Sequence, residues 1–250
     1  MFFMTKETIP EGVGFSTFGA THLLWLLAFA AVLTASIIIY RKLDTNGKNK
    51  MRIILGAAVF ASEMIKNIVA IAVGDFGVGH LPFHLCGISV VLITFDTVKP
   101  TKIVRYFLYY LGIPGAMLAL LFPNWTVLPC MNFFHIHSFT IHMLLVIYPI
   151  ILIAGGDIFP DIKAMPKCIL LLISLAIPIY FINLLCDTNF MFLMEPETGN
   201  PLGLFEKYLG SHLWGFPILL PVVMFIMYIP MLIAAKFKKK DKEQKEKVMV

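Results

Sequence analysis

The chain has 250 residues, of which 59% are hydrophobic and only 14% are charged, and its mean hydropathy is +0.85. A soluble domain is about half apolar and about a quarter charged, so this composition excludes a cytosolic globular domain and a disordered chain. The formal net charge of +5 does not indicate a nucleic-acid partner, because seven of the twenty Lys and Arg residues lie between Lys236 and Lys247, after the last apolar run. Four scattered cysteines without a C-x-x-C pair exclude a disulfide framework.

Apolar runs long enough to cross a bilayer recur along the chain. A helix crossing ~30 Å of hydrocarbon needs about 20 mostly apolar residues, so the sequence predicts an all-α fold, a polytopic membrane helix bundle with seven transmembrane helices. The third is short and starts at Leu81-Pro82, a sequence that suits a first helical turn. Residues 1–235 then form one transmembrane domain, 236–250 form a basic cytoplasmic tail, and 187–212 is long enough to be an ordered cap. The expected spans are 18–40, 53–74, 80–97, 103–122, 132–154, 167–186 and 213–235.

Basic residues are distributed unequally between the two ends of these spans. Seventeen of the twenty Lys and Arg residues follow spans one, three, five and seven, whereas Lys6 and Lys207 lie on the other side and Lys66 lies within span two. Cytoplasmic segments of membrane proteins are enriched in Lys and Arg. We therefore expect the N-terminus outside and the C-terminus in the cytoplasm.

Ionisable residues within the spans gather on the predicted outer side, whereas the inner half has almost no polar side chains apart from the cytoplasmic charges. Such groups cost about 2.5–3.5 kcal/mol each on insertion scales and usually face a bundle interior or a water-filled cavity. Packing or an interfacial position explains any one histidine, but the shared depth of all seven predicts an outward-open polar cavity. The histidines are His22, His80, His84, His135, His137, His142 and His212.

Helical spacing restricts which of these side chains can act together. Glu63 and Lys66 are three residues apart, so they can neutralise each other on one helix face. His84 and Cys86 are two apart and cannot face each other on a regular helix, so a Cys–His pair needs a histidine from another span, of which His142 is the deepest candidate. Near the N-terminal end of its helix, Cys86 would have its thiolate and a developing oxyanion stabilised. The alternative role for Cys86 is a small buried apolar side chain.

Several short motifs occur in order from about residue 15 to 235, and they resemble the bacterial YwaF-like members of the TMEM164 acyltransferase family. The resemblance implies a plasma-membrane protein that transfers a fatty acyl group between phospholipids through a Cys acyl intermediate, assisted by His. The motifs are Phe18-Gly19-Ala20-Thr21-His22-Leu23, Leu81-Pro82-Phe83-His84-Leu85-Cys86, Tyr110-Leu111-Gly112-Ile113-Pro114-Gly115-Ala116, Leu121-Phe122-Pro123-Asn124, Phe133-Phe134-His135 with His142, and Asn189-Phe190-Met191-Phe192-Leu193.

This resemblance suggests catalytic roles for three residues. His142 would act as general base, His84 as a second acid/base or oxyanion partner, and Cys86 as the nucleophile. In the eukaryotic pattern the Cys directly precedes a His after Pro, whereas Pro82-Phe83-His84 fills that slot here. Either Cys86 acts from a different helix face, or the bacterial protein does something else.

The expected substrates are a phospholipid and a lysophospholipid within the bilayer, with no nucleic acid, metal or cofactor. We expect the substrate to be bound by His22, His135, Glu63, Asn183 and Asn189. Two other classes of function remain open. One is a His-based membrane lipid hydrolase, zinc-dependent if His84, His135 and His142 converge. The other is a small transporter or ligand-binding bundle in which Glu63 and Lys66 form a coupling element.

Overall fold

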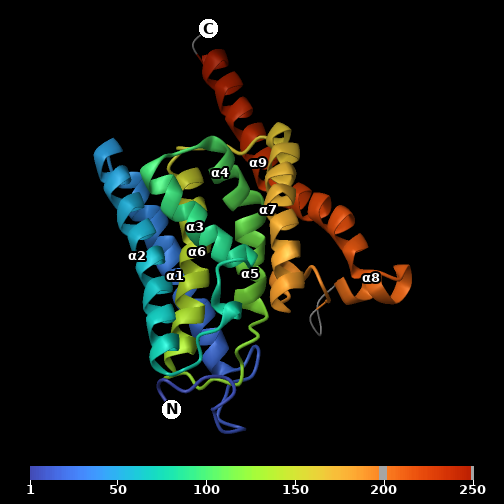
Figure 1. Ribbon diagram of the computed structural model, residues 1–250. Coiled ribbons are helices and arrows are strands. Elements are labelled where there is room, and N and C mark those ends of the chain that lie inside the picture. The colour runs from blue at the N-terminus through green and yellow to red at the C-terminus, as the bar shows by residue number, and fades with distance from the viewer. Residues whose placement is uncertain (197–201, 249–250) are drawn as a thin grey trace.

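The computed structural model describes residues 1–196 and 202–248, with side chains through Lys236 except Ala235, and the regular elements in these ranges are all helical (Figure 1). The N-terminal segment and the C-terminal end of the last helix lie at opposite ends of the bundle. The elements are α1 (Ala20–Lys42), α2 (Thr45–Ala72), η1 (Val78–His80), α3 (Leu85–Val98), α4 (Lys102–Phe107), η2 (Leu108–Gly112), α5 (Ile113–Leu121), α6 (Phe133–Ala154), η3 (Ile162–Ala164), α7 (Met165–Cys186), η4 (Phe190–Phe192), α8 (Leu202–Leu209), η5 (His212–Trp214) and α9 (Gly215–Val248).

Six helical stretches of the described chain are long and apolar enough to cross a membrane. They correspond to all the predicted spans except the third, and α4, η2 and α5 together form the fourth predicted span. The third run forms α3, which has 14 residues and is about 21 Å long at 1.5 Å per residue. The helix α9 continues from the apolar run through the predicted start of the basic tail.

The start of α3 differs from the prediction. Leu81 to His84 is not helical, and His84 is the N-cap with extended φ and ψ angles of −72° and 156°. The segment folds back along the first helical turn, where a Cβ atom on Gly87 would lie 2.7 Å from the Cα of Pro82. Glycine therefore permits the close approach. As a result His84 precedes the helix rather than lying one turn inside it, and Cys86 is the second helical residue.

A π-helical turn interrupts the fourth predicted span. The residues of η2 (Leu108–Gly112) are all buried, and Pro114 follows directly in the first turn of α5. A proline has no N–H to donate, and its ring collides with the carbonyl of the residue four positions earlier, here Tyr110. Widening the helix relieves this collision. The wide turn packs against α9, where the Tyr109 hydroxyl donates to the carbonyl of Met227 at 2.6 Å.

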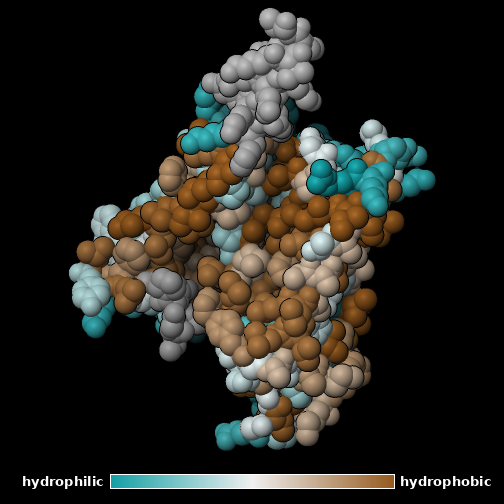
Figure 2. All heavy atoms as spheres, turned by 180° about the vertical axis from the view of Figure 1, so that it is seen from behind, coloured by the Kyte–Doolittle hydropathy of each residue, from teal (hydrophilic) through white to brown (hydrophobic). Residues whose placement is uncertain are grey.

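The core is centred on α6 and on the α4–η2–α5 stretch, whose residues are mostly buried, whereas α1, α2, α7 and α9 expose large apolar side chains. Figure 2 shows hydrophobic residues covering most of one face of the molecule. Exposed apolar surface on this scale fits lipid contact, because a bilayer solvates apolar side chains and excludes unpaired backbone groups.

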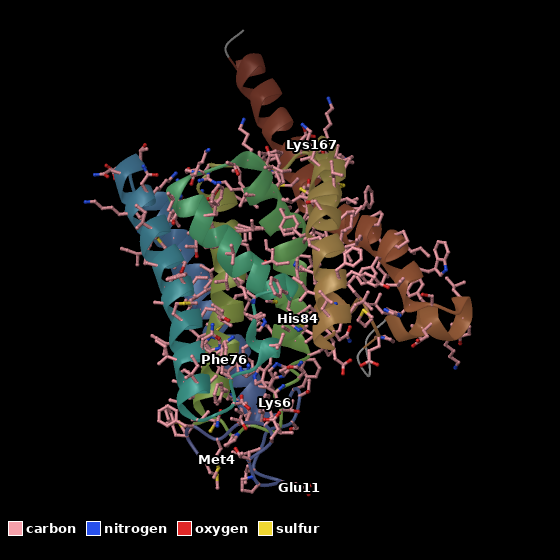
Figure 3. The ribbon with its side chains drawn as sticks, in the orientation of Figure 1. Met4, Lys6, Glu11, Phe76, His84 and Lys167 are labelled. Carbon is pink, nitrogen blue, oxygen red and sulfur yellow. The ribbon has the colours of Figure 1, made fainter. Side chains whose placement is uncertain are left out.

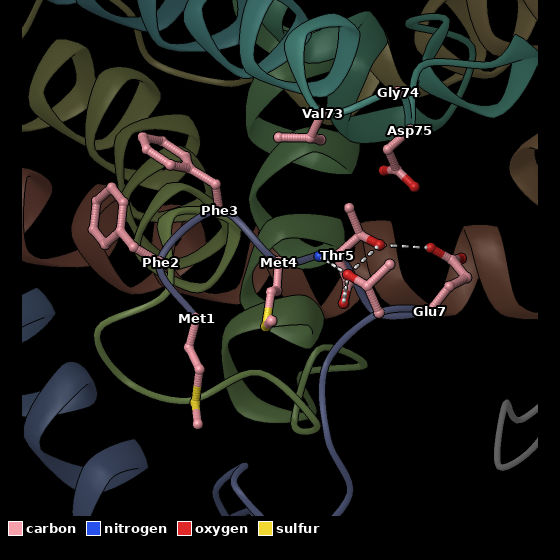
Figure 4. A pocket seen from close by; sticks show the side chains of 10 residues that line it. Met1, Phe2, Phe3, Met4, Thr5, Glu7, Val73, Gly74 and Asp75 are labelled. Carbon is pink, nitrogen blue, oxygen red and sulfur yellow. Dashed lines mark hydrogen bonds between the residues drawn. The ribbon is translucent and has the colours of Figure 1, made fainter.

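Residues before α1 form a strap across the ends of α2 and α6. The Phe2 carbonyl accepts from the Phe133 N–H at 2.7 Å, and Asn132 donates its side-chain amide to the carbonyls of Met1 and Met4. Between the strap and the last turn of α2 lies an open cavity of about 760 Å³, lined by Met1–Thr5, Glu7, Thr8 and Val73–Asp75 (Figure 4). The strap therefore covers the end of the bundle where the histidines lie.

The opposite end contains a buried polar cluster that the sequence interpretation missed. Asp96, near the end of α3, is completely buried and pairs with Arg105 of α4 at 2.9 Å. Tyr148 of α6 donates its hydroxyl to the same carboxylate at 2.8 Å. The expectation that this half has almost no polar side chains apart from the cytoplasmic charges is therefore wrong, because the buried Asp96 carboxylate links α3, α4 and α6.

After α7 the chain forms a loop that holds η4, continues to α8, which stands away from the bundle, and returns through η5 into α9 (Figure 1). Asp187 ends α7 in the left-handed region, with φ at 51°. The predicted cap thus contains short helices, while its residues Glu197, Gly199 and Pro201 lie outside the described residues.

Candidate functional site

His142 on α6 has the geometry of a general base. Its Nδ1 lies 2.6 Å from the carbonyl oxygen of Ser138, one turn earlier on the same helix. Because a carbonyl oxygen only accepts, Nδ1 carries the proton in the neutral ring and Nε2 presents a lone pair. The indole of Trp125 stacks on the imidazole at 5.4 Å and 11° between planes. Together these two contacts fix both the tautomer and the plane of the ring.

Glu63 on α2 is the centre of the polar groups around this histidine. Its carboxylate accepts from Lys66 at 2.5 Å, and its other oxygen lies 3.7 Å from Nε2 of His137 on α6. The three side chains are only 12%, 18% and 9% exposed respectively. The predicted pairing of Glu63 with Lys66 is confirmed, and the contact with His137 adds a second helix to it.

Cys86 and His142 both lie within electrostatic range of Glu63. Cys86 comes from the first turn of α3, which packs against both α2 and α6. In the described part of the chain no hydrogen bond joins the Cys86 thiol to His142. The site therefore collects a carboxylate, an ammonium group, a thiol and two imidazoles from three helices: Glu63, Lys66, Cys86, His137 and His142.

His84 belongs to a different environment from His142. Its Nδ1 accepts from the Met191 N–H at 3.3 Å, and its ring lies 5.1 Å from that of Phe190 and 5.9 Å from that of Phe192. The side chain is exposed at the end of the loop Leu81–His84, and Figure 3 shows it beside α7. The structure thus places the two predicted catalytic histidines among separate sets of neighbours.

The loop that contacts His84 is held in a strained shape. Met191 and Phe192 adopt left-handed φ angles of 59° and 56°, which bulky residues rarely do. His212 lies with Nε2 3.1 Å from the Phe192 carbonyl, which helps to hold this turn. Strain of this kind persists only when the surroundings enforce it, and it clusters at functional sites.

Asn183 and Asn189 organise this same loop through their side-chain amides. Asn183, which is 1% exposed, accepts from the Phe190 N–H at 2.8 Å and donates to the Phe190 carbonyl at 3.0 Å. Asn189 accepts from the N–H groups of Met194 and Glu195. The geometry therefore gives both asparagines a role in shaping the loop, and a substrate contact by either one remains a prediction.

The buried His22 connects two helices through its imidazole. Its Nδ1 accepts from the Phe18 N–H at 2.8 Å, and its Nε2 donates to the Leu120 carbonyl at 2.7 Å. Both ring nitrogens are thereby used within the protein. His135 donates Nδ1–H to the Leu128 carbonyl at 3.1 Å, and its buried Nε2 has no hydrogen-bond partner among the described residues.

The ligand set expected for a zinc hydrolase does not assemble. Within residues 1–196 and 202–248, no three His, Cys, Asp or Glu side chains come together as metal ligands. His84, His135 and His142 instead contact the loop of η4, the Leu128 carbonyl and Trp125, respectively.

His137 and Lys66 are the residues of this cluster that the predicted catalytic and substrate-binding residues did not include, and Lys66 was expected only as the partner of Glu63. The available signal was the charged pair within the apolar span of α2, since such a pair needs polar neighbours. Spacing along α6 alone could not select His137, because the choice depends on which face of α6 packs against α2.

These features define a multi-pass membrane protein of the all-helical class, with a polar, histidine-containing site between α2, α3 and α6. A model of the TMEM164 family matches residues 17–228, and the chain belongs to this family. The matched range includes all five residues of the site. No curated protein and no solved structure matches the chain.

Proposed function

We propose that this protein is an integral membrane acyltransferase that moves a fatty acyl group between phospholipids, in the plasma membrane of a bacterium. The observation that supports the proposal best is the orientation of His142, whose Nδ1–H is held by the Ser138 carbonyl so that Nε2 is left to accept a proton. A partly buried base inside an apolar bundle is well placed to act on the ester group of a lipid whose acyl chain lies among the helices.

The covalent route uses Cys86 as nucleophile. The Cys86 thiol gives its proton to Nε2 of His142, and the thiolate attacks the ester carbonyl carbon of a phospholipid. The tetrahedral intermediate collapses, the C–O bond breaks, and the leaving lysophospholipid oxygen takes the proton from His142. A second lysophospholipid then gives its hydroxyl proton to His142, attacks the thioester and releases the thiol. In the direct route His142 deprotonates the acceptor hydroxyl, and no acyl-enzyme forms.

The first-turn position of Cys86 in α3 supports the covalent route, since N–H groups at a helix N-terminus favour the thiolate and the oxyanion. His84 acts at the loop of η4 in this proposal, where it positions the head group beside Phe190 and Phe192. The polar neighbours Glu63 and Lys66 hold His137 at the edge of the site.

The test uses purified protein in vesicles that contain a phospholipid with a labelled acyl chain and an unlabelled lysophospholipid acceptor. The wild type should transfer label to the acceptor, and His142→Ala should lower the rate by about 10²–10⁴-fold. Cys86→Ala should remove an acyl adduct seen by intact mass if the route is covalent, and should leave transfer intact if it is direct. Cys130→Ala is the matched control, because Cys130 is exposed and lies outside the site.

Label that appears only as free fatty acid would show a hydrolase instead. If the wild type moves no label, or if His142→Ala moves it at the wild-type rate, the proposal is wrong. A binding or transport function would then be the better explanation of the polar cluster.

A further inference from the structure

The polar cluster at the end of the bundle opposite the histidine site contains donors that the fold does not use. Its centre is the Asp96 carboxylate, which accepts from Arg105 Nε at 2.9 and 3.0 Å, from the Thr101 N–H at 3.1 Å and from the Tyr148 hydroxyl at 2.8 Å. Four hydrogen bonds satisfy this carboxylate. They also fix Thr101 and Arg105 beside each other, at the entry to α4.

Arg105 binds Asp96 through Nε alone, so the two terminal nitrogens of its guanidinium do not contact this carboxylate. An arginine commonly binds a carboxylate with two parallel N–H groups, but here Nε serves both oxygens. Neither Nη1 nor Nη2 of Arg105 has a hydrogen-bond partner among the described residues, and Nη2 is fully buried. The hydroxyl oxygen of Thr101 is also buried and has no partner among these residues. A buried donor without an acceptor is costly, so these groups indicate an acceptor that the protein itself does not provide.

Arg52, near the start of α2, adds a positive charge to the same place. Its guanidinium interacts with the Tyr148 hydroxyl, and its Nη1 donates to the Asn49 side chain at 3.0 Å. No described carboxylate forms an ion pair with it, and its Nε is buried without a partner. The other nearby carboxylate, Asp157, is already engaged by Tyr40 and by Lys48. The cluster therefore keeps one positive charge that is not balanced.

We propose that Arg52, Arg105 and Thr101 form a binding site for a phosphate group. A phosphate offers several acceptor oxygens around one negative charge or two, which matches the donors of a guanidinium fork, a second guanidinium and a hydroxyl. Basic pockets between transmembrane helices on the cytoplasmic side bind lipid phosphates. The phosphate comes either from a phospholipid of the adjacent leaflet or from a soluble phosphate ester.

The experiment measures the thermal unfolding of purified protein under two conditions. In detergent free of lipid, inorganic phosphate is titrated against chloride at equal ionic strength. In nanodiscs, phosphatidylglycerol is compared with a neutral glycolipid that has no phosphate. Both are repeated with Arg52→Gln, with Arg105→Lys, which keeps a charge for Asp96 but loses the fork, and with the control Arg41→Gln. Arg41 is exposed and lies at the end of α1 on the same side of the bundle.

A bound phosphate should raise the unfolding temperature of the wild type and of Arg41→Gln, and should do so much less for Arg52→Gln and Arg105→Lys. Stabilisation by inorganic phosphate identifies a soluble ligand, and stabilisation only by phosphatidylglycerol identifies a lipid. Equal shifts in all four proteins, or no shift from either source, would overturn the proposal. Arg52→Gln keeps the test valid if Arg105→Lys does not fold, since Arg52 supports no carboxylate. The result is independent of acyl transfer because the measurement is of binding at the other end of the bundle.

Discussion

The imidazole Nε2 of His137 lies 3.7 Å from a carboxylate oxygen of Glu63, and this contact joins α6 to α2 inside the bundle. The same carboxylate accepts from Lys66 at 2.5 Å. The carboxylate of Glu63 thus has polar neighbours on its own helix and on α6, in an otherwise apolar environment. The helix α6 also packs against α3, which carries Cys86 in its first turn.

The ion pair of α2 should be more costly to break than to remove. Lys66→Met leaves the carboxylate of Glu63 with only a neutral neighbour, and breaking a buried pair commonly costs about 3–5 kcal/mol. The double variant Glu63→Leu, Lys66→Met removes both charges. We expect the single variant to give less folded protein by size-exclusion chromatography than the double variant. A double variant that folds worse would contradict this and would show that Glu63 has a further structural partner.

His22 and His142 should respond to substitution in opposite ways. His22→Ala leaves the Phe18 N–H and the Leu120 carbonyl without partners, and a buried unsatisfied group costs about 1–3 kcal/mol. We therefore expect a loss of folded protein, whereas His142→Ala should fold and lose activity. Unfolding midpoints and labelled acyl transfer measure the two effects. A well-folded but inactive His22→Ala would place His22 in the site.

The Asp96 cluster should dominate stability at the other end of the bundle. Asp96→Leu leaves Arg105 as a buried unpaired charge, which typically costs about 3–5 kcal/mol. Tyr148→Phe removes one hydrogen bond to a charged acceptor, which is worth about 1.5–3 kcal/mol. We expect the unfolding midpoint in detergent to fall in both variants, and further in Asp96→Leu. Equal midpoints for the two variants would mean that the Asp96–Arg105 ion pair adds no stability beyond that of the Tyr148–Asp96 hydrogen bond.

The strap should loosen from α2 as the pH rises. Burial and the neighbouring Glu7 carboxyl raise the pKa of Asp75, while His80 opposes this shift. The hydrogen bond from the Thr5 hydroxyl lowers the pKa of Glu7. A raised pKa in the folded state means that Asp75 favours the closed strap when protonated, and this contribution is lost as the pH rises through the raised pKa. The lowered pKa of Glu7 acts in the opposite direction, because the contribution of ionised Glu7 to strap closure is lost as the pH falls.

Hydrogen exchange of residues 2–12, corrected for the intrinsic pH dependence, measures this opening from below pH 4 upward. We expect the protection of this segment from exchange to decrease as the pH rises through the raised pKa of Asp75. The variant Asp75→Asn should not show this decrease. A step of the same size in Asp75→Asn would assign it to another group.

The orientation prediction depends on the uneven distribution of Lys and Arg. Reporter fusions at residues 46, 99 and 240 should report the cytoplasm, and a fusion near residue 199 should report the outside. A fusion at 240 that reports the outside would overturn the orientation and would move the histidine site to the cytoplasmic half.

Six of the seven expected spans coincide with helices long enough to cross a membrane, because the length of an apolar run is a local property of the sequence. The same holds for the pairing of Glu63 with Lys66, since residues three apart on a helix are neighbours whatever surrounds them. The start of α3 could not be predicted in this way. It depends on Leu81–His84 packing back against Gly87, which a proline signal for helix starts does not reveal.

The sequence by itself determined that this protein is an all-helical membrane protein whose histidines lie in one half, since composition and run length are properties of the chain alone. Only the tertiary structure decided which of them belong together. His137 contacts Glu63, and Cys86 and His142 lie in the same region, because α2, α3 and α6 pack against one another, whereas His84 caps α3 and contacts the loop of η4. The hydrogen bonds of Asp96 are likewise long-range, and their partners follow from how α3, α4 and α6 pack against one another.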